Sequence, residues 1–332
     1  MPSVRIEPHG EHVVYVLEDA AGRSSARILA DYGFNCYSFQ CEVAGKQYEL
    51  IDAAPRFADE PSRASGNGTP ILFPFPNRIR GGRFIFNGQQ FELPRNERGV
   101  NAIHGLVIDR PWRVTFVGPE GHAELRGEFH LKRDAPELAS LWPADFVIEM
   151  SYSLAGNQLT SRVRVTNPDS RPLPWGLGTH PYFRLPIVAG GDESQCSVQA
   201  PAAELWELAD LLPTGRKIPV PAMLDLRNGR PMSELRVDHV FGGLTFVNGC
   251  CTSQLTDRTA GIEVTFRFDQ LFRELVIYIP PRRGSICLEP YTCVTDAINL
   301  QPKGIDAGLR VLKPGEAAEG MMVLEARGWQ NH

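Results

Sequence analysis

An all-β fold of antiparallel strands is predicted by the regular alternation of apolar and polar side chains along the chain. Every second residue from Phe146 to Leu154 is apolar, and the alternation resumes over Leu159–Val165 after the turn residues Gly156-Asn157. Two alternating runs joined by a short glycine-containing turn are typical of a β-hairpin. The 31 glycines and 27 prolines are spread over all 332 residues rather than gathered into a linker. Many short strands separated by turns favour a sandwich or barrel, in one large domain.

Further strands follow from the same reasoning. The segment 84–93 alternates on both sides of Asn87-Gly88, which predicts a second hairpin. Ile262–Asp269 alternates strictly, and Leu275–Ile279 is a continuous apolar run that indicates a strand buried on both faces. A short helix is expected only over Ala202–Leu212, between two prolines.

Composition excludes several classes of function. A net charge of -5 and the absence of Lys/Arg runs argue against nucleic acid and against an anionic membrane surface as partners. No run of eighteen apolar residues is present, so no membrane span is expected. Acidic residues interrupt the N-terminal stretch where a signal peptide would be apolar, and seven cysteines form no CxxC or disulfide pattern. We therefore expect a cytoplasmic protein with reduced thiols.

Two histidines lie in segments that suit a binding site. His104 follows the second hairpin in the segment NAIHG, and His180 lies in WGLGTHPYF, among glycines, a proline and aromatic residues. Rigid loops lined by aromatic rings suit the apolar face of a sugar, and they also suit a corner of the protein core. The spacing by itself leaves a structural role open for both histidines.

Three polar positions are further candidates. Glu289 follows an apolar strand and precedes a proline, so burial is expected to raise its pKa, as suits a general base; an ion pair with an arginine is the structural alternative. Arg78, after Asn77, follows a rigid proline-rich segment and offers a planar fork to hydroxyls or carboxylates, or forms a surface ion pair. Asp238 either caps a turn or accepts hydrogen bonds from substrate hydroxyls.

The ordered set of motifs resembles the aldose 1-epimerase (galactose mutarotase) family over about residues 13–325. The matching segments are PILFPFPNRIRGGRFIFNG, NAIHG, WGLGTHPYF, LPTGRKIPV with LDLRNGRP, VDHVF, LEPYTCVTDAIN and VLKPGE. The resemblance implies a large antiparallel β-sandwich of the galactose mutarotase type, with few short helices, in a single domain over residues 1–332. It also implies an isomerase that interconverts the anomers of a free galactose-like or glucose-like monosaccharide and needs no cofactor and no metal. A monomer and a homodimer are both compatible with the sequence.

The family's functional residues carry over by motif. Glu289 corresponds to the general base, His180 to the general acid and His104 to a histidine that assists at the ring oxygen. Arg78, with Asn77, and Asp238 correspond to residues that bind sugar hydroxyls. A neighbouring carboxylate is expected to keep His180 in its charged form.

Two further positions are less specific. Tyr182 and His239 are neighbours without an assigned role. The segment Leu141-Trp142-Pro143 resembles the place of an aromatic wall that the family often has.

Three other functions remain open at this point. Two histidines and a glutamate are a possible zinc site, although they are widely separated and lack HExxH-type spacing. Asp238 and Glu289 are a possible carboxylate pair of a glycosidase. A catalytically inactive carbohydrate-binding or sensory protein of the same fold is the alternative outside enzymes.

Overall fold

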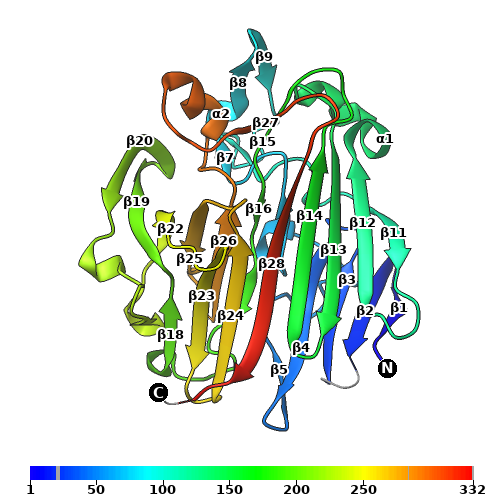
Figure 1. Cartoon of the computed structure of the whole chain (residues 1–332), viewed down its shortest axis with the longest axis vertical. Coiled ribbons are helices and arrows are strands. Elements are labelled where there is room, and N and C mark those ends of the chain that lie inside the picture. Colours follow the sequence, from blue (N-terminus) through cyan, green and yellow to red (C-terminus); the bar gives the residue numbers. More distant parts are fainter. Residues whose placement is uncertain (20–22, 283, 331–332) are drawn as a thin grey trace.

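The computed structural model describes residues 1–19, 23–282 and 284–330, and most of these residues lie in antiparallel strands (Figure 1). The largest sheet has nine strands in the order β11-β12-β13-β14-β28-β24-β23-β18-β21. Its strands are β11 (Arg113–Val117), β12 (Glu124–His130), β13 (Val147–Ala155), β14 (Gln158–Thr166), β28 (Ala317–Gly328), β24 (Ile262–Asp269), β23 (Cys250–Asp257), β18 (Cys196–Gln199) and β21 (Arg230–Pro231).

Two further sheets lie against this large one. The first has the order β1-β2-β3-β4-β5, with β1 (Ser3–His9), β2 (His12–Asp19), β3 (Ser24–Leu29), β4 (Asn35–Val43) and β5 (Lys46–Glu49). The second has eight strands in the order β20-β19-β22-β25-β26-β16-β6, with β17 also paired to β26. Its strands are β20 (Leu212–Pro219), β19 (Ala202–Ala209), β22 (Asp238–Leu244), β25 (Glu274–Tyr278), β26 (Ser285–Tyr291), β16 (Gly178–Thr179), β6 (Ile71–Leu72) and β17 (Tyr182–Arg184).

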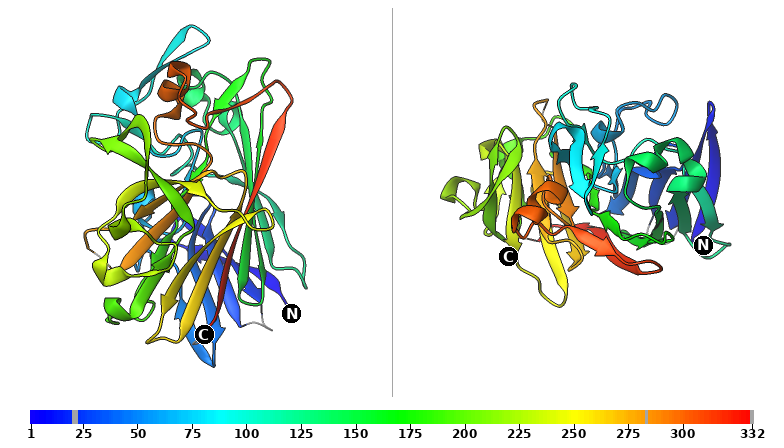
Figure 2. Two further views of the ribbon diagram at one scale, coloured as in Figure 1. Left: turned by 60° about the vertical axis from the view of Figure 1, so that its left-hand side comes forward. Right: turned by 90° about the horizontal axis from the view of Figure 1, so that it is seen from above.

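Short elements close one end of the layers, where the β8–β9 hairpin and α2 project in Figure 2. The paired strands here are β7 (Arg78–Ile79) with β10 (Ala102–Ile103), β8 (Arg83–Phe86) with β9 (Gln89–Glu92), and β15 (Leu173–Trp175) with β27 (Arg310–Leu312). The helices are α1 (Leu131–Asp134) and α2 (Ala297–Leu300), with 3-10 turns at Ala64–Gly66, Arg80–Gly82, Pro136–Leu141, Glu193–Gln195, Ala222–Leu224, Met232–Glu234 and Gln301–Lys303.

The hydrophobic core fills the space between the layers. Phe73 contacts Phe146 edge to face, with ring centroids 4.8 Å apart, and also packs against Trp175. Phe183 of β17 packs against Phe266 of β24, which joins the eight-stranded sheet to the nine-stranded one. The alternation seen in the sequence arises because one side of each strand faces this core.

The predicted all-β sandwich is confirmed, and so are its hairpins. β13 and β14 pair around Gly156-Asn157, and β8 and β9 pair around Asn87-Gly88. β24 and β25 occupy the two further predicted strands, and Leu275 to Ile277 are buried along β25. No helix in the described parts of the chain is long and apolar enough to cross a membrane.

The helix expected over 202–212 is wrong, because residues 202–209 form β19. This strand lies between β20 and β22, so both of its edges are hydrogen-bonded. Leu205 and Trp206 are adjacent and both buried, each on one face of the strand, as an interior strand requires. Burial within the sheet therefore overrides the local helical preference of the Ala-, Glu- and Leu-rich segment.

Candidate active site

Strand β26 presents three polar side chains on one face. Cys287, Glu289 and Tyr291 alternate with apolar residues, and successive side chains of a strand point to opposite faces. All three are at most 1% exposed. The carboxyl group of Glu289 thus lies inside the protein, on a strand that is paired with neighbouring strands on both sides.

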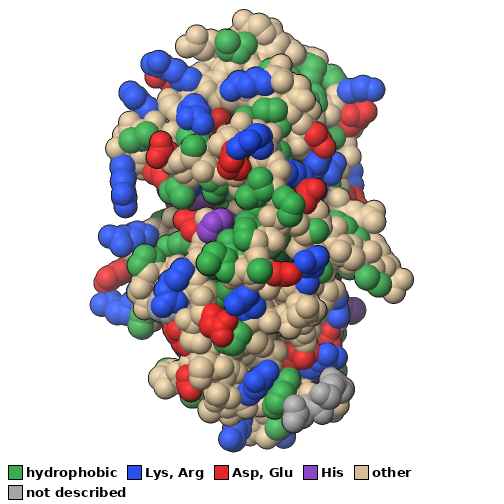
Figure 3. All heavy atoms as spheres, turned by 90° about the vertical axis from the view of Figure 1, so that its left-hand side faces the viewer, with side chains coloured by type: hydrophobic (Ala, Val, Ile, Leu, Met, Phe, Trp, Pro, Cys, Tyr) green, Lys and Arg blue, Asp and Glu red, His purple; other side chains and the backbone are tan. Residues whose placement is uncertain are grey.

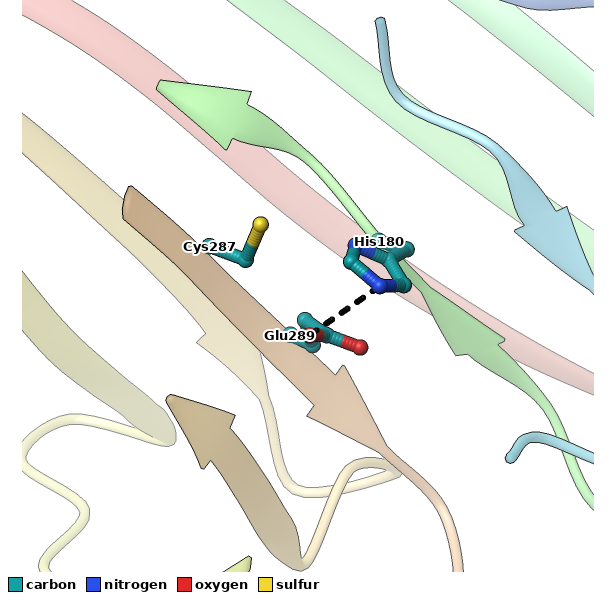
Figure 4. Close-up of side chains that lie close together, drawn as sticks. All are labelled: His180, Cys287 and Glu289. Atoms are coloured by element: carbon teal, nitrogen blue, oxygen red, sulfur yellow. Dashed lines mark ion pairs between the residues drawn. The ribbon is translucent and has the colours of Figure 1, made fainter. Parts of the chain in front are cut away.

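His180 faces Glu289 because of the strand register. It lies between β16 and β17, which both pair with β26, and Gly178 of β16 is opposite Tyr291. Counting two residues along each antiparallel strand places His180 opposite Glu289. The His180 Nε2 atom lies 3.4 Å from Glu289 Oε1. A dashed line marks this ion pair in Figure 4.

Tyr291 holds the other oxygen of the Glu289 carboxyl group. Its hydroxyl donates a hydrogen bond of 2.5 Å to Glu289 Oε2. Gly178 makes room for the ring, since a Cβ atom at this position would lie 2.4 Å from Tyr291 Cδ1. The two oxygens of Glu289 therefore have different neighbours, a histidine and a tyrosine.

Aromatic rings surround the His180 imidazole. Tyr182 stacks on it with a centroid distance of 4.7 Å and an interplanar angle of 7°, and Tyr278 meets it edge to face at 6.3 Å. Trp142, expected near an aromatic wall, is instead 1% exposed, and its indole N–H donates to the Pro174 carbonyl. Its ring packs between core phenylalanines, so it is a core residue.

His104 reaches the site from a tightly folded loop. Its backbone has a φ of 67°, and its N–H donates to the Asn77 carbonyl at 2.9 Å. Gly105 has a φ of 77°, and a Cβ there would lie 2.1 Å from the Phe73 carbonyl oxygen, so only glycine fits. The His104 and His180 rings meet edge to face at 5.5 Å.

Arg78 is held by a carboxylate of the protein itself. Its Nε and Nη2 atoms donate to Glu97 Oε1 at 2.8 and 2.5 Å, and its Nη1 donates to Asn77 Oδ1 at 3.0 Å. Burial alone would raise the pKa of Glu97, but the hydrogen bonds from Arg78 and Asn101 lower it. Arg78 is thus an oriented donor with its side chain 15% exposed.

Asp238 begins β22 at the open side of this constellation. It is paired in register with Tyr278, which is in turn paired with Cys287, so the three side chains form a row across the sheet. The Asp238 side chain is exposed to solvent, although partial desolvation raises its pKa against the opposing effect of Arg78. Histidine side chains lie beside acidic and hydrophobic ones at mid-height of the face in Figure 3.

Burial controls the protonation of the central pair. It raises the pKa of Glu289 well above its ordinary value, although the Tyr291 hydroxyl and Arg78 act in the opposite direction. It lowers the pKa of His180 to about 3, and it lowers the pKa of His104 well below the ordinary histidine value. The expectation that a carboxylate would keep His180 charged is therefore wrong: desolvation outweighs the neighbouring charge, and the neutral forms are favoured.

The structure brings the sequence-predicted residues together around one point. His180 contacts Glu289 directly, His104 packs on His180, and the pKa of Glu289 responds to both Arg78 and Asp238. Asn77 accepts a hydrogen bond from Arg78, and its side chain is also hydrogen-bonded to the Tyr291 hydroxyl.

Sequence reasoning gave no role to Tyr291, Cys287 or Glu97. The alternation along β26 was the available signal for the first two. Nothing in the spacing pointed to Glu97.

One group of described residues has the composition of a metal site. Ligand atoms of His180, Cys287 and Glu289 all lie within 4.8 Å of one another. His104, which the zinc alternative included, is not a member of this group, and its buried Nδ1 atom has no hydrogen-bond partner among the described residues.

Known proteins are similar to this chain in sequence and in fold. The family model for aldose 1-epimerase matches residues 17–325. The uncharacterized protein YphB of Escherichia coli strain K12 is 25% identical over 80% of this chain and 87% of its own length. The galactose mutarotase of Rattus norvegicus is 28% identical over 50% of this chain and 47% of its own.

A solved structure extends the likeness to the whole fold. The crystal structure of a galactose mutarotase-like protein from Clostridium acetobutylicum superimposes with a TM-score of 0.87 at 24% identity, and covers 98% of both chains.

Proposed function

The chain belongs to the aldose 1-epimerase family, and we propose that it interconverts the α and β anomers of a free aldose by acid–base ring opening and reclosure. The observation that carries this proposal is the contact of 3.4 Å between His180 Nε2 and Glu289 Oε1. The C1 hydroxyl and the ring oxygen of an aldose are both bonded to C1. A base and an acid that serve them must therefore lie side by side, each within hydrogen-bond reach of its oxygen.

In the proposed reaction Glu289 takes the proton of the C1 hydroxyl while His180 gives a proton to the ring oxygen. The bond between C1 and the ring oxygen breaks, and an open-chain aldehyde forms. Rotation about the C1–C2 bond presents the other face of the aldehyde, and the same two proton transfers in reverse close the ring. No proton is gained or lost over the cycle.

The protonation of the pair fits this cycle when the pair is treated as one unit. Because burial favours the neutral forms, one proton rests on Glu289 and His180 begins as neutral imidazole. Transfer of this proton from Glu289 to His180 creates the base and the acid together, without uptake from solvent. The Tyr291 hydroxyl and Arg78 both favour the carboxylate that this transfer produces.

The remaining residues are assigned to substrate positioning. His104 assists at the ring oxygen beside His180. Arg78, oriented by Glu97 and Asn77, and Asp238 bind sugar hydroxyls. Galactose or glucose is the proposed substrate, by analogy with the family.

The size of the effect can be estimated. Each positioned acid or base contributes about 10²–10⁴-fold, and the two together about 10⁴–10⁸-fold. At about 1.4 kcal/mol for each tenfold, this lowers the barrier by roughly 5–11 kcal/mol.

Polarimetry tests the proposal with freshly dissolved α-anomers of a panel of aldoses, including phosphorylated ones. Faster mutarotation than in buffer is expected for at least one aldose, and it should be lost in Glu289→Gln and in His180→Asn. Saturable sugar binding without faster mutarotation would instead identify a binding protein. Release of sugar from an aryl glycoside would identify a glycosidase.

A further inference from the structure

Cys287 shares the working face of β26 with Glu289 but has no part in the proposed proton transfers. Its side chain is fully buried, and Figure 4 shows it beside Glu289 and His180. The thiol, the imidazole and the carboxyl group each offer one ligand atom, and the three atoms lie within 4.8 Å of one another. All three residues come from paired strands or from the turn between them, so their backbones are fixed.

These are the ligand types that zinc prefers. Zn²⁺ binds thiolate at about 2.3 Å, and imidazole and carboxylate at about 2.0–2.2 Å, in a tetrahedron. Ligand atoms at those distances are separated by roughly 3.3–3.6 Å. The 3.4 Å between His180 Nε2 and Glu289 Oε1 already matches this separation. The separations from the Cys287 sulfur are at most 4.8 Å, so each needs to shorten by no more than about 1.5 Å to reach the tetrahedral range.

We propose that His180, Cys287 and Glu289 form an inhibitory site for a thiophilic divalent cation, represented by Zn²⁺. The cation takes the lone pairs of both the proposed base and the proposed acid, so proton transfer stops while it is bound. The fourth position of the tetrahedron is left for water or for a sugar hydroxyl. Binding of the cation does not depend on the proposed function, whereas its inhibitory effect rests on that function.

Proton release accompanies this binding. Only the thiolate form of Cys287 is a ligand, so the thiol gives up its proton when the cation binds. The proton on Glu289 is displaced as well, because only the carboxylate is a ligand. Affinity for Zn²⁺ is therefore expected to rise with pH.

Cysteine also sets the selectivity of the site. Magnesium and calcium take oxygen ligands and gain little from a thiolate and an imidazole. We expect Zn²⁺, Cd²⁺ and Co²⁺ to bind, and Mg²⁺ to leave mutarotation unchanged.

Cobalt provides a readout that needs no activity, since a Co²⁺–thiolate bond gives a charge-transfer absorption band. The purified full chain is titrated with Co²⁺, and mutarotation is measured over a Zn²⁺ series. Cys287→Ser is compared with Cys250→Ser, because Cys250 is the one cysteine of the seven that is not buried and lies outside the site. Cys287→Ala is a second variant that places no hydroxyl in the buried position.

The expected result separates the variants. Wild type and Cys250→Ser show the absorption band and are inhibited by Zn²⁺. Both Cys287 variants keep mutarotation but lose the band, and they require at least about tenfold more Zn²⁺ for half-inhibition. The proposal is overturned if the band persists without Cys287, if Cys250→Ser abolishes it, or if wild type shows no band. A wild-type protein that shows the band but no mutarotation would refute the proposed function and leave the metal site standing.

Discussion

The hydrogen bond from Tyr291 to Glu289 is expected to set how readily Glu289 gives up its proton. Tyr291→Phe removes only the hydroxyl, which lies 2.5 Å from Glu289 Oε2, and keeps the buried ring beside Gly178. A hydrogen bond to a charged group contributes about 1.5–3 kcal/mol. This bond stabilises the carboxylate relative to the protonated acid, so its loss should raise the pKa of Glu289 further.

The same free energy determines the rate. Because the proposed reactive form has its proton on His180 and a carboxylate at Glu289, the loss of about 1.5–3 kcal/mol reduces its population by about 10–150-fold. Polarimetry across a pH series should show kcat/KM lower by this factor in Tyr291→Phe. The fall at alkaline pH, where the pair loses its proton, should move to higher pH.

A second buried tyrosine supplies the matched control. Tyr152 of β13 is 2% exposed, and its hydroxyl contacts the Phe34 carbonyl at 3.5 Å, outside the site. Tyr152→Phe should keep the wild-type rate and pH profile. A Tyr291→Phe variant that behaves like Tyr152→Phe, or whose fall in activity at alkaline pH moves to lower pH, would contradict this role of the hydrogen bond.

Four other outcomes are expected. Glu289→Gln and His180→Asn should each lower kcat by about 10²–10⁴-fold with little change in the free energy of unfolding, measured by urea denaturation; near-full activity in either would remove its assignment. In wild type, kcat/KM should stay level as the pH falls through 6.5, because the pKa of His180 is lowered to about 3. A decrease in kcat/KM near pH 6.5 would instead indicate an ordinary, solvated histidine. Asp238→Asn should raise KM about tenfold with a smaller change in kcat, and the reverse pattern would place Asp238 in the chemistry. Gly105→Ala should destabilise the fold more than Gly88→Ala. Both glycines have a positive φ, which costs alanine about 1–2 kcal/mol, but only at Gly105 would the new Cβ atom also lie 2.1 Å from a backbone oxygen. Equal losses in the free energy of unfolding would mean that the loop of His104 moves to accommodate the methyl group.

The strands were predictable because their side chains alternate toward a single core. β13, β14 and β24 each bury one face, so period two is visible in the letters. β19 escaped prediction because both of its faces carry buried residues, which hides the alternation. This segment forms a strand because it pairs with β20 and β22, and the sequence of the segment itself does not reveal that pairing.

The candidate site residues were chosen as members of motifs, but the contacts between them could not be predicted from the sequence. His180 and Glu289 meet because β16 and β17 pair with β26 in one particular register, and sequence spacing does not encode that register. Tyr291 was within reach, since it lies two residues after Glu289 on the same strand face. The protonation of His180 was predicted in the wrong direction because the depth of burial depends on the whole sheet.

Burial at this depth also explains how the site is compatible with a stable fold. The Glu289 side chain is 1% exposed and the His180 side chain is 8% exposed. If both were charged, each would carry a desolvation penalty of several kcal/mol. The neutral pair avoids most of this cost, because neither group carries a full charge while the site rests. Charge separation is then needed only during the proposed proton transfers. The groups that favour it, the Tyr291 hydroxyl and Arg78, are already oriented by Glu289, Glu97 and Asn77. Donors that are fixed before the reaction begins need no reorganisation when the charge appears, and this makes their contribution larger in a buried site than in water.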